Sequence, residues 1–189
     1  RSFFEFAGSF PGPTTNPQNP AHTPGGSSSG SGAAVADFMV HGAFGTQTGG
    51  SVLRPASFCG TVGYKPTYNL INRSGLMFAA ENLDTIGLLT RTVDDADLLM
   101  SVLLNRPRSK VIPNDANPKI GLCRTHHWNS ALPETIAAMD DSVVRLTAAG
   151  AEIVDLTLPD SFADLSPARN VLNDFERSRV MADLWQNER

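Results

Sequence analysis

The spacing of apolar residues predicts a helix after Thr92. Apolar residues recur there three or four positions apart, so they line one face of a helix. Thr92, followed by Asp95 three positions later, is typical of a helix N-cap. The predicted inward stripe consists of Val93, Ala96, Met100, Leu103 and Leu104. Upstream, residues 70–89 offer short strand-like pieces.

A strand, a helix and a second strand are predicted in the C-terminal half. Residues 119–123 and 151–158 are short apolar runs of strand length. Between them, Pro133 suits the first turn of a helix and Gly150 suits its end. The apolar stripe of this helix is Ile136, Met139, Val143 and Leu146. This order implies a parallel βαβ unit with a right-handed crossover, and residues 166–184 then form a last helix.

Small residues and turn formers dominate the N-terminal half. Residues 1–26 are rich in Pro, Asn, Thr and Gly, so we expect an extended lead-in that wraps a surface. A Ser/Gly loop at 27–31 enters a buried helix of mostly small residues up to Val40. Glycines break residues 42–63 into loops, which commonly hold sites. The predicted fold class is therefore α/β, a mixed sheet covered by helices.

Length, charge and cysteine usage limit the kind of protein. A chain of 189 residues suits one domain, and two are not expected. The net charge of −4, without a basic run, gives no indication of nucleic acid or an anionic membrane surface as a partner. Cys59 and Cys123 lie far apart without a CxxC or histidine-rich context, which argues against zinc and for a reducing compartment. The chain lacks a long apolar run and a signal pattern, so we expect a cytoplasmic protein.

Two Gly-Gly-Ser units carry the candidate chemistry. In Gly49-Gly50-Ser51, the glycines allow successive backbone N–H groups to turn toward a point beside the serine oxygen, as stabilisation of an oxyanion requires. A tight turn with a capping serine is the structural alternative. Gly25-Gly26-Ser27 lies 24 residues earlier, and the arm between the two serines is long enough to fold them together.

The first unit has other interpretations. A flexible linker is disfavoured by the helix that follows directly, and a phosphate-binding loop lacks its Gly-Lys-Ser/Thr. Gly30-Ser31-Gly32 lacks the third glycine of a dinucleotide-binding motif. Gly26 to Gly30 satisfies the G-x-S-x-G nucleophile elbow, with Ser28 as nucleophile and His126 or His127 downstream. That elbow must follow a strand, whereas a proline-rich coil precedes it here.

Four ordered motifs, GGSSSGS, GTQTGGS, RPASFCGTVGYKPT and LDTIGLLTRTVDDADLL, together resemble the amidase signature family. The match is dense from Phe4 to Leu104 and looser to the end. The resemblance implies an amidase-signature α/β/α core with a mixed sheet, here incomplete at both ends. It also implies hydrolysis of the carbon–nitrogen bond of small-molecule amides through a serine acyl-enzyme, without a cofactor. We expect one partial domain with residues 1–26 as lead-in, 27–104 as signature core and 119–189 as the βαβ unit with the final helix; a homodimer stays open.

The resemblance assigns roles to individual residues. Ser51 is the nucleophile, and Ser27 is the relaying serine, held by a cis peptide bond after Gly26. Arg54 either binds a substrate carboxylate, as in members such as malonamidase, or pairs with a structural carboxylate. The expected oxyanion hole consists of the backbone amides of Thr48, Gly49, Gly50 and Ser51.

Other positions within the motifs are expected to be structural. Gln47 stands where many family members carry an aspartate, so the hydrogen bond to that loop is expected to be made differently. Cys59, Lys65 and Asp84 match family positions that we interpret as packing and loop-fixing.

The third member of the family's Ser–Ser–Lys triad is a lysine well before the first Gly-Gly-Ser, and residues 1–26 contain no lysine. Lys65, Lys110 and Lys119 do not match its position. We therefore expect the catalytic lysine to lie outside these 189 residues. Two alternatives remain: a subunit of the tRNA-dependent amidotransferase, whose Ser-Ile-Arg-Gln-Pro is replaced here by Ser51-Val-Leu-Arg-Pro55, and a non-catalytic amidase-like binding domain.

The 189 residues alone are therefore expected to hydrolyse a simple amide such as benzamide poorly. Loss of the base from a serine triad lowers the rate by about 10⁴- to 10⁶-fold. Turnover at ordinary enzyme rates that is abolished by Ser51→Ala would contradict the expected need for an additional lysine.

Overall fold

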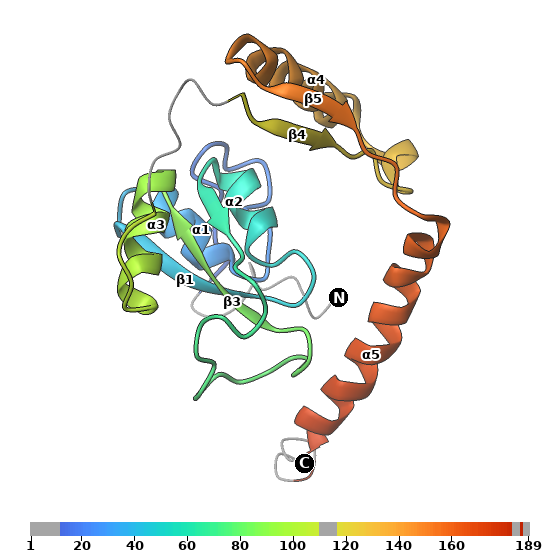
Figure 1. The fold of residues 1–189 in the computed structure, drawn as a ribbon. Helices are drawn as coiled ribbons and strands as arrows, with labels where there is room; N and C mark the ends of the chain where they lie inside the picture. Colours follow the sequence, from blue (N-terminus) through green and yellow to red (C-terminus); the bar gives the residue numbers. More distant parts are fainter. Residues whose placement is uncertain (1–11, 110–116, 183–185, 187–189) are drawn as a thin grey trace. The chain divides into compact units, whose positions relative to one another are not determined.

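The computed structural model describes residues 12–109, 117–182 and 186, which belong to two compact units (Figure 1). The first unit is formed by Arg1–Ser109 with Leu172–Arg189, and the second by Lys110–Val171. Each unit is described by itself. The assignment of the whole chain to one partial domain stays a prediction.

A three-stranded antiparallel sheet forms the centre of the first unit. Its order is β1 (Gly42–Gln47), β3 (Thr85–Thr90) and β2 (Val62–Tyr64). β1 pairs with β3 along its whole length, from Gly42 opposite Thr90 to Gln47 opposite Thr85. β1 is thereby an edge strand of the described sheet, and the loop that holds Ser51 leaves from its end.

Helices cover both faces of this sheet. Leu88 and Leu89 of β3 are fully buried and point to opposite faces, as neighbours on a strand do. Leu89 packs with residues of α1 (Ser29–Ala36) and α2 (Leu53–Cys59), and Leu88 packs with Met100 of α3 (Val93–Leu103). The first unit is thus a small α/β/α sandwich, in agreement with the predicted class.

Residues 70–84 correct the expectation of several strand-like pieces. Only Thr85–Thr90 within the 70–89 segment forms a strand, and the residues before it form turns. Side chains take up backbone groups that a strand would pair with a neighbour. Arg73 donates to the carbonyls of Glu81 and Asp84, and the Asp84 carboxylate accepts from the N–H of Ala80.

Helix α1 is shorter than predicted. It ends at Ala36, and Phe38 adopts a left-handed conformation with φ of 59°, a common way to end a helix. Phe38, Met39 and Val40, expected within the buried helix, are exposed. Arg91 donates to the Val40 carbonyl at 2.6 Å and so helps to hold this turn.

The predicted N-cap of α3 is confirmed. The Thr92 hydroxyl oxygen accepts from the N–H of Asp95 at 3.1 Å. Ala96 and Met100 are buried as predicted, but Val93 is 71% exposed. The inward stripe is therefore one turn shorter at its N-terminal end than the periodicity suggested.

The second unit contains the predicted βαβ arrangement. β4 (Lys119–Leu122) pairs in parallel with β5 (Glu152–Asp155), and α4 (Pro133–Ala148) connects them with Pro133 in its first turn. No residue of α4 is fully buried, because the two strands cover only part of its apolar stripe. Short 3₁₀ turns lie at Trp128–Ser130 and Asp160–Asp164.

The last helix, α5, runs over Leu165–Val180, close to the predicted start, while residues 183–185 of the predicted helix lie outside the described residues. Its C-terminal half belongs to the first unit. The Glu176 carboxylate there accepts from the backbone N–H of Asn82 at 3.0 Å and from the Asn82 side-chain amide. Among the described helices, none is long and apolar enough to cross a membrane.

Glu176 gives this attachment a pH dependence. Its hydrogen bonds from the side chain and then the backbone of Asn82 lower the pKa of the Glu176 carboxyl. A lowered folded-state pKa stabilises the fold fully above the ordinary glutamate pKa of about 4.3, and this stabilisation is lost as the pH falls through the lowered value. In urea unfolding, wild type should exceed Glu176→Gln in midpoint at about pH 6, and the difference should shrink toward about pH 3.

Glu134→Gln is the matched control, since Glu134 is an exposed residue with no hydrogen bond to another described side chain. A Glu176→Gln difference that stayed constant over this pH range would refute the role of the ionised carboxylate.

Candidate active site

The two Gly-Gly-Ser units meet in the first unit of the structure. The backbone N–H of Ser28 donates to the Ser51 carbonyl at 3.2 Å. Ser27 directly precedes this contact, and the peptide bond from Gly26 to Ser27 is cis, as the family resemblance implied. Ser51 is 6% exposed and Ser27 is half-buried. The arm between the serines thus folds them together as expected.

Two further serines of the GGSSSGS motif hold the free edge of β1. The Ser28 hydroxyl oxygen accepts from the N–H of Thr46 at 3.3 Å. One helical turn later, the Ser31 hydroxyl donates to the Phe44 carbonyl at 2.7 Å. Polar groups of an edge strand need partners, and these side chains supply them in place of another strand. Ser28 therefore has a structural role beside Ser27.

This arrangement removes the nucleophile-elbow interpretation of Ser28. The described residues before it, 12–28, contain no strand. His126 and His127 lie in the second unit, where their rings contact the Pro159 carbonyl and the Ser166 hydroxyl, each at 3.3 Å. The two histidines belong to a polar loop after β4, as the sequence suggested.

Gln47 fixes the turn that carries Ser51. Its side-chain oxygen accepts from the backbone N–H groups of Val52 at 2.9 Å and Leu53 at 3.0 Å, at the start of α2. These are groups that a helix N-terminus leaves without a partner. The hydrogen bond expected from the position that is often aspartate is therefore made by an amide, which caps the helix after the nucleophile.

The backbone N–H groups from Thr48 through Ser51 stand in contrast to the two that follow. Within the described part of the chain, none of these four donates a hydrogen bond. They lie beside the buried Ser51 and are available to an incoming oxygen. Free N–H groups in a fixed loop are what an oxyanion hole requires.

Asp84 holds the same loop from the other side. The Thr48 hydroxyl donates to the Asp84 carboxylate, which is 3% exposed and also accepts from the N–H groups of Ala79 and Ala80. This agrees with a loop-fixing role for Asp84. The part played by the Thr48 side chain was not expected from the sequence.

The lead-in contributes residues that the sequence analysis missed. The Asn16 amide donates to the Phe58 carbonyl at 2.9 Å, and the Gln18 amide donates to the Cys59 carbonyl at 3.1 Å. Both bonds fasten the lead-in to the end of α2. The Cys59 thiol contacts the Pro24 carbonyl at 3.4 Å, and burial raises its pKa, so it behaves as a packing residue.

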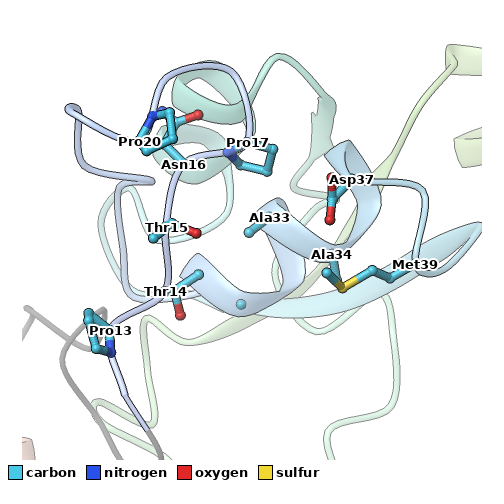
Figure 2. A pocket seen from close by; sticks show the side chains of 11 residues that line it. Pro13, Thr14, Thr15, Asn16, Pro17, Pro20, Ala33, Ala34, Asp37 and Met39 are labelled. Carbon is cyan, nitrogen blue, oxygen red and sulfur yellow. The ribbon is translucent and has the colours of Figure 1, made fainter.

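On its other side the lead-in faces α1. Figure 2 shows Thr14, Thr15 and Asn16 of the lead-in opposite Ala33 and Ala34 of α1, around a pocket of about 320 Å³. The described part of the lead-in, from residue 12, therefore wraps a surface as predicted. The signal in the sequence that could have identified its anchoring residues is the set of polar amides between prolines in NPQNPAHTPGG.

Arg54 lies in the first turn of α2. Its backbone N–H donates to the Gly50 carbonyl at 2.8 Å, and a Cβ atom added to Gly50 would lie 3.1 Å from its guanidinium Nη2. The side chain is exposed, and no carboxylate of the described residues pairs with it. The described structure thus offers no partner for the structural alternative.

The described lysines are engaged away from the two serines. Lys65 donates to the Pro66 carbonyl at 2.8 Å, and Lys119 pairs with Glu152 at 3.1 Å. Lys110 lies outside the described residues. Nowhere in the described ranges do three His, Cys, Asp or Glu side chains gather as a metal site would need.

Residues 3–184 match the family model named Amidase. The chain belongs to this family. A solved structure described as an amidase superposes with a TM-score of 0.85 at 31% identity, over 96% of this chain and 42% of that one. Native peptide amidase from Stenotrophomonas maltophilia gives a TM-score of 0.72 at 29% identity, over 91% of this chain and 39% of its own.

Several curated family members similar to this chain bear another name. The A-type subunit of glutamyl-tRNA(Gln) amidotransferase from Brachyspira hyodysenteriae is 41% identical over 165 residues, 79% of this chain and 34% of the relative. The structure of the same amidotransferase subunit from Thermotoga maritima has a TM-score of 0.76 at 34% identity, over 88% of this chain and 40% of that one. The chain thus spans about a third of the length of the curated relatives it matches.

The cap formed by Gln47 yields a test. Gln47→Leu leaves the N–H groups of Val52 and Leu53 without their acceptor, and a buried unpaired polar group costs about 1–3 kcal/mol. Gln47→Glu keeps an acceptor oxygen and should lose less in the free energy of unfolding, measured in urea. Equal losses in the two variants would show that the hydrogen bonds contribute little.

Proposed function

We propose that this chain supplies the nucleophile and the relaying serine of an amide-hydrolysing active site. The observation that carries the proposal is the loop from Thr48 to Ser51, in which free backbone N–H groups surround a buried serine. The second serine loop is hydrogen-bonded to it through Ser28. Ser27 and Ser51, with the amides of Thr48, Gly49, Gly50 and Ser51, are the proposed site.

In this mechanism the Ser51 oxygen attacks the amide carbon and forms a C–O bond, while its proton passes to Ser27 and on to a base. The carbonyl oxygen becomes an oxyanion that the loop N–H groups bind. Collapse breaks the C–N bond, and the amine leaves with a proton returned through Ser27. Water then attacks the Ser51 ester and releases the acid.

The proposed base is a lysine that the 189 residues do not supply. Lys65 and Lys119 are held by other partners, and an unassisted serine is a poor nucleophile. The family resemblance places the lysine before the first Gly-Gly-Ser. The proposal therefore concerns the protein expressed from its complete reading frame, and cytoplasmic location stays a prediction.

A second candidate function is that of an amidotransferase component that takes nitrogen from glutamine. The name of the curated relatives supports it, and because that name describes one subunit of an enzyme, it implies further protein partners for this chain as well. Glutamine combines an amide with a carboxylate, and the exposed Arg54 beside Gly50 suits such a substrate. Ammonia release from glutamine, but not from benzamide, would favour this candidate. A protein that releases ammonia from neither would favour the binding-domain alternative.

Labelling with a fluorophosphonate, which captures activated serines, tests the site. In the protein from the complete reading frame we expect one label on Ser51, absent in Ser51→Ala and slowed by about 10²-fold or more in Ser27→Ala. Ser57→Ala, an exposed serine on α2, is the control. Undiminished labelling of Ser51→Ala would refute Ser51 as the nucleophile.

Arg54 is proposed to bind a substrate carboxylate. Arg54→Ala should raise KM for an amide that carries a carboxylate by about tenfold or more and spare a neutral amide, because a charge-assisted bond is lost only with the first. Steady-state kinetics on both substrates provide the comparison. Equal losses on the two would assign Arg54 to the structure instead.

A further inference from the structure

Arg73 binds more partners than any single contact requires. It lies in the turn segment before β3, where Nη1 donates to the carbonyls of Glu81 at 2.6 Å and Asp84 at 3.1 Å. Nη2 donates to the Tyr68 hydroxyl at 2.8 Å, and Nε donates to the Asn69 side-chain oxygen at 3.3 Å. All three nitrogens of the guanidinium thus tie one end of the 68–84 segment to the other.

Aromatic rings flank the same group. The guanidinium carbon lies 4.4 Å from the centre of the Tyr68 ring and 4.9 Å from that of Phe78. A planar fork with several N–H groups and stacking faces is particular to arginine, and a lysine ammonium cannot reproduce it. No carboxylate among the described residues forms an ion pair with Arg73, so its role is geometric.

Asp84 connects this cluster to the candidate active site. Arg73 holds its backbone carbonyl, and its side-chain carboxylate accepts from the Thr48 hydroxyl. Thr48 begins the run of free N–H groups that ends at Ser51. The next residue, Thr85, pairs with Gln47, so Asp84 is fixed at the point where the sheet meets the nucleophile loop.

We infer that Arg73 is a positioning residue for the nucleophile loop. It fixes the Asp84 backbone, and Asp84 in turn sets the orientation of Thr48 and its N–H group. The inference rests on the proposed function, because it concerns the rate at which Ser51 reacts. Arg73 does not touch Ser51 or Ser27 in the structure; its effect passes through the bond between Asp84 and Thr48.

Arg91 offers a matched control within the same unit. Its guanidinium also donates to backbone carbonyls, those of Val35 at 3.2 Å and Val40 at 2.6 Å, and stacks on the Phe38 ring at 5.0 Å. It contacts neither Asp84 nor Thr48 among its described partners. Removal of either arginine costs local packing, but only that of Arg73 should reach the nucleophile.

The test is the rate of fluorophosphonate labelling of Ser51 in the protein from the complete reading frame. Arg73→Met and Thr48→Val should each lower the maximal labelling rate by about tenfold, with the half-saturating probe concentration unchanged. The double variant should be no slower than Thr48→Val alone, because both changes break one path. Arg91→Met should lose thermal stability yet label at the wild-type rate.

Two results would overturn the inference: Arg73→Met labelling at the wild-type rate, or slowing by the same factor with and without the Thr48 hydroxyl. The second would make Arg73 a residue of general stability. If Arg73→Met does not fold, Arg73→Lys, which keeps the charge without the fork, takes its place in the same cycle with the same criteria. Labelling that persists in Ser51→Ala would instead refute the proposed function, whatever Arg73 does.

Discussion

The hydrogen bond from the Ser28 N–H to the Ser51 carbonyl joins the two loops on which the candidate site depends. Ser28 stands at the N-terminus of α1, and Ser51 stands just before α2, so one backbone contact sets the starts of two helices against each other. The side chain of Ser28 meanwhile bonds the edge of β1. A single residue thus fixes helix, strand and nucleophile loop together, which leaves Ser27 next to the nucleophile loop.

The close approach of the two helices is possible because the facing residues are small. A Cβ atom on Gly25, whose φ is +74°, would lie 3.1 Å from the backbone of Pro55 in α2. A larger residue there would push the first Gly-Gly-Ser away from the second. Gln47 and Asp84 then secure the nucleophile loop from its two ends, since one caps α2 and the other holds Thr48. The loop is rigid while its own N–H groups stay free.

The family relationship accommodates both proposed functions for a chemical reason. Hydrolysis and nitrogen transfer share the formation of an acyl-enzyme on serine, and they differ in the use made of the released amine. The described core holds groups for the shared step, namely the nucleophile, the relay and the free N–H groups. Solved structures of a peptide amidase and of an amidotransferase component superpose on the same chain, as expected if the differences lie in other parts of those proteins.

The sequence by itself determined the βαβ unit, the Thr92 cap and the meeting of two Gly-Gly-Ser units, since periodicity, capping and motif order are local properties of the chain. It did not predict the turns at 70–84 or the end of α1 at Ala36. Only the tertiary structure decided which serines are structural, and that Arg73, Asp84 and Thr48 form one connected path. These roles depend on hydrogen bonds between residues far apart in the chain. No local pattern specifies such bonds, because they form only when the sheet brings the segments within reach.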